Sequence, residues 1–257
     1  MKRTLLWGLA AIVAVLLSLL VSFPAAWLAP LVERQTNGRY TLSAAQGTLW
    51  AGSARITGVS NSVELAALTL PGRFVWTFSP SLLIGKVDAS ITNTELLERP
   101  LTISGNWRTW HLGEFVLSLP ASQLTALGAP LNTLKPTGRM HLSSQSLRVL
   151  SNPEGLQIHG VMQLQLNDIA SVLSPVKPLG TYRMEFDWQG IRAQLTLSTL
   201  SGLLQLQGNG AIENGHLRFS GQAWALPEHE PQLANLLNLL GRRHQIENRT
   251  VFVIEFT

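Results

Sequence analysis

The sequence predicts a mainly β protein, in which a single N-terminal transmembrane helix precedes an antiparallel β-sheet domain with two or three short helices. One observation is a long uncharged apolar run at the N-terminus. Another is the alternation of apolar and polar residues in many later segments bounded by Gly, Pro, Asn and Ser, which is the period of a strand. We therefore expect a cytoplasmic tip at 1–4, a transmembrane anchor at 5–28 and a β-rich domain at 30–257, built as a curved sheet or a sandwich.

The anchor is predicted from an uncharged run that extends over residues 4–32. Residues 5–23 alone would span about 28 Å as a helix, close to the ~30 Å hydrocarbon core of a bilayer. A cleaved signal peptide is the alternative, but its apolar region is shorter and a small-x-small cleavage site follows it. Here proline and bulky residues occupy the candidate site at 23–29, which favours an uncleaved anchor. Lys2 and Arg3 then place the N-terminus in the cytoplasm and the rest of the chain across the membrane.

A stripe of small residues follows one face of this helix, at Ala10, Ala14, Ser18 and Ser22. Small side chains at every fourth position let two membrane helices approach closely, so the stripe is a candidate packing face for a partner helix. The alternative is that Ala and Ser are simply common in membrane helices.

The β-strands are predicted one after another along the chain. The clearest runs from Tyr182 to Trp188, and a Gln189-Gly190 turn leads into the next strand. Asn214-Gly215 is the dipeptide that a two-residue hairpin prefers. These segments predict a meander of antiparallel strands with one apolar and one polar face. Further strands are expected at 73–78, 86–92, 101–107, 113–119, 139–142, 156–166, 191–198 and 204–207, and the turn at 214–215 joins a strand ending at Ile212 to one containing Leu217 and Phe219.

Helices are expected only at 121–134, 168–173 and 231–243. The last has leucines at helical spacing: Leu233, Leu236, Leu237 and Leu240. Gly241 marks its end, and we expect the cations at 242–244 beside the negative helix terminus.

Two similar segments, KPTG at 135–138 and KPLG at 177–180, each precede a strand with a methionine. They indicate either chance or a repeated unit of helix plus strands that stacks into a larger curved sheet.

Composition and motifs exclude most chemistry. The chain contains no cysteine, so disulfides and thiol nucleophiles are absent, and no run of like charges indicates nucleic-acid binding. The six histidines lack metal-ligand spacing, and neither a G-x-S-x-G elbow nor a phosphate-binding loop is present. Gly208-Asn209-Gly210 is expected to form a turn between strands. We therefore predict no catalytic, cofactor-binding or metal-binding residues, and no enzyme.

One block resembles a known family. Gly47, Thr48, Leu49, Trp50 and Gly52 follow shortly after the anchor. They are similar to the GTLW-x-G-x-A block of the type II secretion system protein N (general secretion pathway protein N) family. Segments 119–131 and 236–242 and a Gly-x-Met strand are similar too, so the resemblance covers nearly the whole chain. From the residues alone, Gly47 and Gly52 suit turns that flank a strand at 48–50, with Trp50 as an inward packing anchor.

The resemblance implies an accessory protein of the bacterial inner membrane with one span, a cytoplasmic N-terminus and a periplasmic domain. It would act in the machine that exports folded proteins across the outer membrane. Its partners would be other inner-membrane platform proteins, and the family brings no catalytic residues. The alternative is an anchored periplasmic lipid-binding or lipid-transfer module, because an apolar-faced sheet and segment 73–83 are also similar to AsmA-type proteins.

Overall fold

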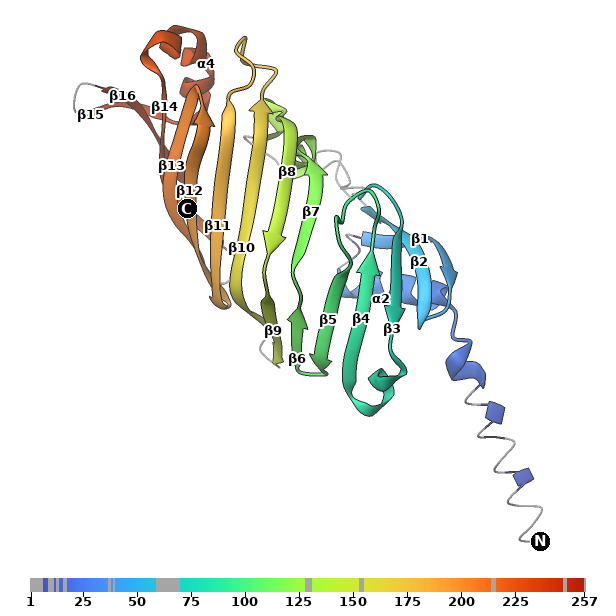
Figure 1. Ribbon diagram of the computed structural model, residues 1–257. Coiled ribbons are helices and arrows are strands. Elements are labelled where there is room, and N and C mark those ends of the chain that lie inside the picture. The colour runs from blue at the N-terminus through green and yellow to red at the C-terminus, as the bar shows by residue number, and fades with distance from the viewer. Residues whose placement is uncertain are drawn as a thin grey trace.

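The computed structural model describes residues 7–8, 12, 14–15, 18–36, 38, 40–58, 70–127, 131–152, 155–213, 216–246 and 249–256. Within them the chain forms one open antiparallel sheet of sixteen strands. The N-terminal segment leaves at one side of the sheet, and α4 lies near the other (Figure 1). The predicted mainly β, antiparallel architecture with few short helices is confirmed, and it is a single sheet and not a sandwich.

The strands are β1 (Tyr40–Gly47), β2 (Ala51–Gly58), β3 (Phe74–Phe78), β4 (Lys86–Thr92), β5 (Leu101–Asn106), β6 (Thr109–Leu112), β7 (Phe115–Pro120), β8 (Thr137–Ser144), β9 (Leu147–Asn152), β10 (Gly155–Ala170), β11 (Gly180–Gly190), β12 (Arg192–Gly202), β13 (Leu204–Glu213), β14 (His216–Ala225), β15 (Arg242–Ile246) and β16 (Arg249–Phe256). The helices are α2 (Leu28–Gln35), α3 (Leu131–Leu134), α4 (Glu230–Leu240) and the 3-10 turns η1 (Ala25–Trp27), η2 (Pro80–Ile84), η3 (Ala121–Leu127) and η4 (Pro227–His229).

Neighbouring strands in the sheet are mostly neighbours in the chain. The order is β1-β2-β3-β4-β5-β6-β9-β10-β11-β12-β13-β14-β16-β15, while β8 pairs with β10 and β7 pairs with β8. β6 and β7 are separated only by residues 113–114, and β8 and β9 only by residues 145–146. Each of these pairs therefore acts as one long strand with a short interruption, and the sheet is a continuous meander up to β14.

Alternating residues give the sheet one apolar and one polar face. On β11, Met184 lies opposite Leu164 of β10 and Leu197 of β12, whereas the next residue, Glu185, lies opposite polar residues on both neighbours. The predicted alternation along Tyr182 to Trp188 therefore corresponds to the two faces, because successive side chains of a strand point to opposite sides.

The largest buried cluster lies where α4 packs on the apolar face. Leu233, Leu236 and Leu237 are buried there, as the leucine spacing predicts. Burying each leucine side chain contributes about 1.5–3 kcal/mol of transfer free energy. The buried side chains that pack against them come from β12, β13, β14 and β16 and from the loop before β11: Leu179, Leu195, Leu204, Phe219, Ala223, Phe252 and Ile254.

Three local predictions are wrong. The helix expected at 168–173 is absent, because β10 continues to Ala170 through a bulge at Asp168, whose φ is +49°. The helix expected to reach residue 243 ends at Leu240, and the cations at 242–244 form the start of β15. Residues 208–210 lie inside β13 and not in a turn, and a Cβ on Gly208 would lie 2.5 Å from the ring of Phe219.

Other elements are found in part. The helix expected at 121–134 consists of η3 and α3, with residues 128–130 outside the described part. The Asn214-Gly215 turn also lies outside it, although the flanking residues Glu213 and His216 pair as a two-residue hairpin requires. The two similar segments begin β8 and β11, which flank β10, but no helix precedes the second within the described residues. A repeated helix-plus-strands unit is therefore not found.

The predicted anchor at 5–28 lies partly outside the described residues. Among those that are described, no helix has the length and apolarity that a membrane crossing needs. Ala10 lies outside the described part, while Ala14, Ser18 and Ser22 are exposed. A packing role for this stripe stays a prediction.

Candidate docking site between the N-terminal helix and the sheet

The sequence Gly-Thr-Leu-Trp forms the tight turn between β1 and β2, which we call the GTLW turn (residues 47–52). Gly47 and Gly52 are paired across the strands, and the Thr48 amide donates to the Ala51 carbonyl at 2.9 Å. Gly47 has a φ of +82°, where a Cβ would also lie 2.5 Å from the Ala51 carbonyl oxygen. Glycine therefore allows the chain to reverse here. The strand predicted at 48–50 is wrong: these residues are the turn itself.

The GTLW turn donates hydrogen bonds to the N-terminal helix, whose last residues are 18–21, and to the segment that follows it. The Trp50 indole Nε1 donates to the Leu20 carbonyl at 2.8 Å, and the Leu49 amide donates to the Phe23 carbonyl at 2.8 Å. Thr48 also forms a β-bridge with Pro24. The last carbonyls of a helix have no partner within the helix, so the turn supplies donors that the helix end lacks.

The same turn is held on its other side by the sheet. The Trp76 indole Nε1 donates to the Leu49 carbonyl at 3.0 Å, and the Phe78 amide donates to the Trp50 carbonyl at 2.7 Å. Gly52 lies directly under Trp76, since a Cβ at position 52 would be 2.6 Å from the indole ring. Trp76 is buried and forms a small core with Ala25 and Ala54. Trp50 therefore connects the helix and the sheet through its indole nitrogen and its backbone carbonyl, while the Trp76 ring provides the buried packing.

Helix α2 adds a second connection between the N-terminal segment and β1. The Thr41 hydroxyl donates to the Glu33 carboxylate, and the Tyr40 amide donates to the Thr36 hydroxyl at 3.2 Å. Thr36 Oγ1 in turn donates to the Val32 carbonyl at 2.8 Å. The segment from Leu20 to Tyr40 is thus attached to the first hairpin at both ends.

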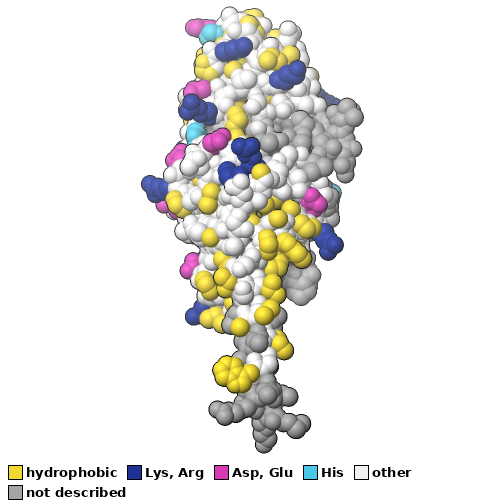
Figure 2. Space-filling model, turned by 90° about the vertical axis from the view of Figure 1, so that its right-hand side faces the viewer, with side chains coloured by type: hydrophobic (Ala, Val, Ile, Leu, Met, Phe, Trp, Pro, Cys, Tyr) yellow, Lys and Arg dark blue, Asp and Glu magenta, His cyan; other side chains and the backbone are white. Residues whose placement is uncertain are grey.

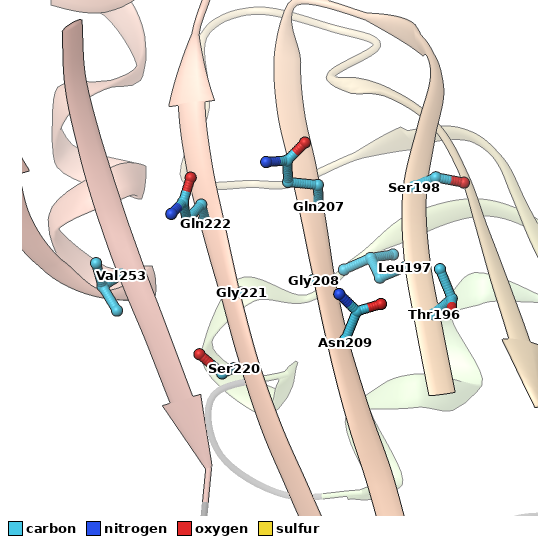
Figure 3. A pocket seen from close by; sticks show the side chains of 10 residues that line it. All are labelled: Thr196, Leu197, Ser198, Gln207, Gly208, Asn209, Ser220, Gly221, Gln222 and Val253. Carbon is cyan, nitrogen blue, oxygen red and sulfur yellow. The ribbon is translucent and has the colours of Figure 1, made fainter. Parts of the chain in front are cut away.

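The polar face of the sheet carries shallow hollows. Figure 3 shows one of about 450 Å³ that crosses β12, β13, β14 and β16. Its polar lining consists of neutral hydroxyl and amide side chains: Thr196, Ser198, Gln207, Asn209, Ser220 and Gln222. These groups can donate and accept hydrogen bonds but cannot act as acids or bases near neutral pH. The described residues hold no group of three or more potential metal ligands.

Sequence reasoning identified the turn residues but missed their partners. The acceptors are the backbone carbonyls of Leu20 in the N-terminal helix and of Phe23 after it, which carry no signal in the sequence. The sequence places Trp76 in the strand expected at 73–78, but nothing in its spacing from Trp50 indicates that both indoles meet the same turn.

The comparisons with known proteins agree with the resemblance noted in the sequence. A family model described as "Type II secretion system (T2SS), protein N" matches residues 38–250. The matched part contains the GTLW turn and α4, and it begins after the N-terminal helix. No curated protein and no solved structure matches the chain.

Proposed function

Because the chain belongs to the type II secretion system protein N family, we propose that it is an accessory component of that system with a structural, non-catalytic role in exporting folded proteins across the outer membrane. Membership of the family implies involvement in type II secretion and interaction with other components of the system. The proposal goes further in assigning the role of a scaffold and in naming inner-membrane platform proteins as the partners.

In this proposal residues 5–28 anchor the chain in the inner membrane, with residues 1–4 in the cytoplasm and residues 30–257 in the periplasm. The uncharged run at 4–32 and the flanking Lys2 and Arg3 support this arrangement. The stripe at Ala14, Ser18 and Ser22 would then be available to a partner helix.

The observation that carries the proposal is the double attachment of the GTLW turn. Trp50 bonds the N-terminal helix through Leu20, and Leu49 accepts from Trp76 of the sheet. A sheet attached in this way keeps one orientation relative to the helix. The hollow across β12, β13, β14 and β16 on its polar face is lined by neutral hydrogen-bonding groups, which suits a protein partner better than a charged ligand.

Complementation tests this role. A strain that lacks the chain should retain a folded type II substrate in the periplasm, and the intact gene should restore its release into the medium. The double variant W50A/W76A should restore secretion poorly although it accumulates in the membrane, whereas L239A, at an exposed position of α4, should restore it fully. Normal secretion without the chain, or full restoration by W50A/W76A, would refute the scaffold role.

A lipid-binding role is the second candidate. Side chains on the apolar face of the central strands are only partly buried, among them Ile103, Trp110 and Leu112. An apolar surface of this kind is compatible with acyl chains. Native mass spectrometry of the full chain extracted from membranes would support the lipid role by a retained phospholipid mass, and a lipid-free mass would count against it.

A further inference from the structure

Three loops lie side by side at the end of the sheet where the GTLW turn meets the helix. Ala51 pairs with Thr77, next to the start of η2, and Lys86 pairs with Asn106, at the turn between β5 and β6. The GTLW turn, η2 and the 106–109 turn are therefore consecutive at one set of strand ends. The N-terminal segment leaves the sheet from this same end (Figure 1).

Two of these loops present large apolar side chains to the outside. Ile84 is 77% exposed, Trp107 is 63% exposed and Leu83 is 56% exposed. We call these three residues the apolar tip. Trp107 lies against the neighbouring loop, because a Cβ on Gly85 would be 3.1 Å from its indole ring. The tip is thus one surface made by two loops.

Hydrogen bonds to the backbone fix the conformation of both loops, so the apolar side chains are held in their exposed positions. Ser79 caps η2 by accepting from the Ser81 amide, and the Gly85 amide, at a φ of +85°, donates to the Leu82 carbonyl at 3.2 Å. Asn106 Oδ1 accepts from the amides of Arg108 and Thr109 at 2.9 and 2.8 Å. Such turns usually carry polar residues at their outermost positions. Large apolar groups held there indicate a contact with something apolar.

The charges around the tip are cationic. Lys86 and Arg108 flank it and are exposed, and segments 79–86 and 104–109 contain no acidic residue. The nearest carboxylate in the chain is Asp88, farther along β4. An apolar centre with a basic rim matches a phospholipid surface with anionic headgroups, which attract basic side chains.

The position of the tip relative to the N-terminal helix also supports a contact with a membrane. The Trp50 bond to Leu20 fixes the helix beside this end of the sheet. Figure 2 shows that hydrophobic side chains gather toward the N-terminal segment, whereas most charged side chains lie farther away over the sheet. The polarity of the surface thus changes along the direction that leads to the proposed anchor.

We propose that Leu83, Ile84 and Trp107 insert into the interfacial layer of the same bilayer that holds the N-terminal helix, on the periplasmic side. This inference rests on the proposed membrane anchor and adds a second point of contact. Tryptophan prefers the headgroup level, and the aliphatic pair can reach the upper acyl chains. Together with the helix, the tip would prevent the sheet from rotating about the helix axis.

Single-cysteine labelling tests this contact on the full chain, which has no natural cysteine. L83C, V172C and V15C are each labelled with an environment-sensitive fluorophore and reconstituted into vesicles of phosphatidylethanolamine and phosphatidylglycerol. Val172 is the matched control for Leu83, because the exposed fractions of the two side chains are 58% and 56%. Val172 lies after β10, at the opposite ends of the strands. V15C reports whether the N-terminal helix is in the membrane. Lipids spin-labelled near the headgroup should quench L83C at least about twofold more than V172C if the tip is inserted. V15C, near the middle of the proposed span, is measured with lipids spin-labelled deep in the acyl chain.

The outcomes separate the two proposals. Quenching of V15C without extra quenching of L83C would overturn the tip and leave the anchor standing. Absence of quenching at V15C would overturn both. A fluorescence shift at L83C that depends on protein concentration and not on lipid would assign the surface to a second copy of the chain and refute membrane insertion. In the L83C background, K86Q/R108Q should reduce quenching in phosphatidylglycerol vesicles and change it little in neutral phosphatidylcholine vesicles.

Discussion

The indole nitrogen of Trp50 donates a hydrogen bond of 2.8 Å to the backbone carbonyl of Leu20, thirty positions earlier in the chain. The bond connects the GTLW turn directly to the N-terminal helix. Trp50, a residue of the family block, therefore lies at the junction between the N-terminal segment and the sheet. The first group of predictions concerns this junction.

Replacing Trp50 with Phe should weaken the junction, because Phe keeps an aromatic ring but cannot donate to Leu20. The loss of one hydrogen bond to a partly buried carbonyl costs about 1 kcal/mol, or roughly a fivefold change in local opening. Hydrogen exchange in detergent should therefore show faster exchange of the Leu49 amide, which donates to Phe23. W107F, at an exposed position, is the control. Equal exchange in the two variants would argue against a role for the indole bond.

Replacing Gly52 with Ala should destabilise the first hairpin. The new Cβ would lie 2.6 Å from both the Thr48 carbonyl oxygen and the Trp76 ring, so the turn or the indole must move. Overpacking of this kind costs about 1–3 kcal/mol. The thermal unfolding midpoint should fall for G52A and stay close to that of the parent for A51S, since Ala51 is the exposed neighbour. A parent-like midpoint for G52A would show that the turn relaxes freely.

Replacing Tyr182 with Phe should change the response of the protein to alkaline pH. Burial raises the pKa of the Tyr182 hydroxyl, because the phenolate is disfavoured where it cannot be hydrated. The native state keeps this proton when the unfolded chain begins to lose it near pH 10, so stability is full below that pH and falls above it. Urea denaturation at rising pH should therefore show a steeper alkaline loss for the parent than for Y182F.

The control for this titration is Y40F, which changes the only other tyrosine of the chain. Y40F should keep the steep alkaline loss of the parent. Because Tyr182 also donates to the Leu204 carbonyl at 3.1 Å, Y182F should be less stable at neutral pH by about 1 kcal/mol. Parallel profiles of stability against pH for the parent and Y182F would contradict the raised pKa of the Tyr182 hydroxyl.

Replacing Leu237 with Ala should destabilise the part of the sheet under α4. Leu237 is fully buried in the largest core cluster, and truncating a buried leucine costs about 2–5 kcal/mol. L239A, on the exposed side of the same helix, should cost little and serves as the matched control. Urea denaturation followed by tryptophan fluorescence measures both. Similar free energies of unfolding for the two variants would mean that α4 does not pack as described.

The sequence predicts the sheet well where local patterns decide it. The alternation around Met184 defines the faces of β11, and the leucine spacing defines the buried side of α4. It fails where distant partners decide. The Thr-Leu-Trp run has residues typical of a strand, but Gly47, Leu20 and Trp76 together make it a turn.

The helix predicted after Asp168 fails for a similar reason. Ile169 pairs with Gly180 of β11 and Ala170 pairs with Thr137 of β8, so two neighbouring strands hold this segment in extended form. Pairing on both sides outweighs a weak local preference for helix. In the candidate site, too, the backbone acceptors of Leu20 and Phe23 could not have been found from residue types.

The order of the strands bears on the order in which the sheet can form as the chain is synthesised. From β1 to β14 each long strand pairs with the one that precedes it in synthesis, when the interrupted pairs β6–β7 and β8–β9 are counted as single strands. Pairing between sequential neighbours closes only short loops. The sheet can therefore grow strand by strand as the chain is extended, beginning beside the N-terminal segment. Only the final step, in which β16 inserts between β14 and β15 and α4 covers the apolar face, must wait for the C-terminus.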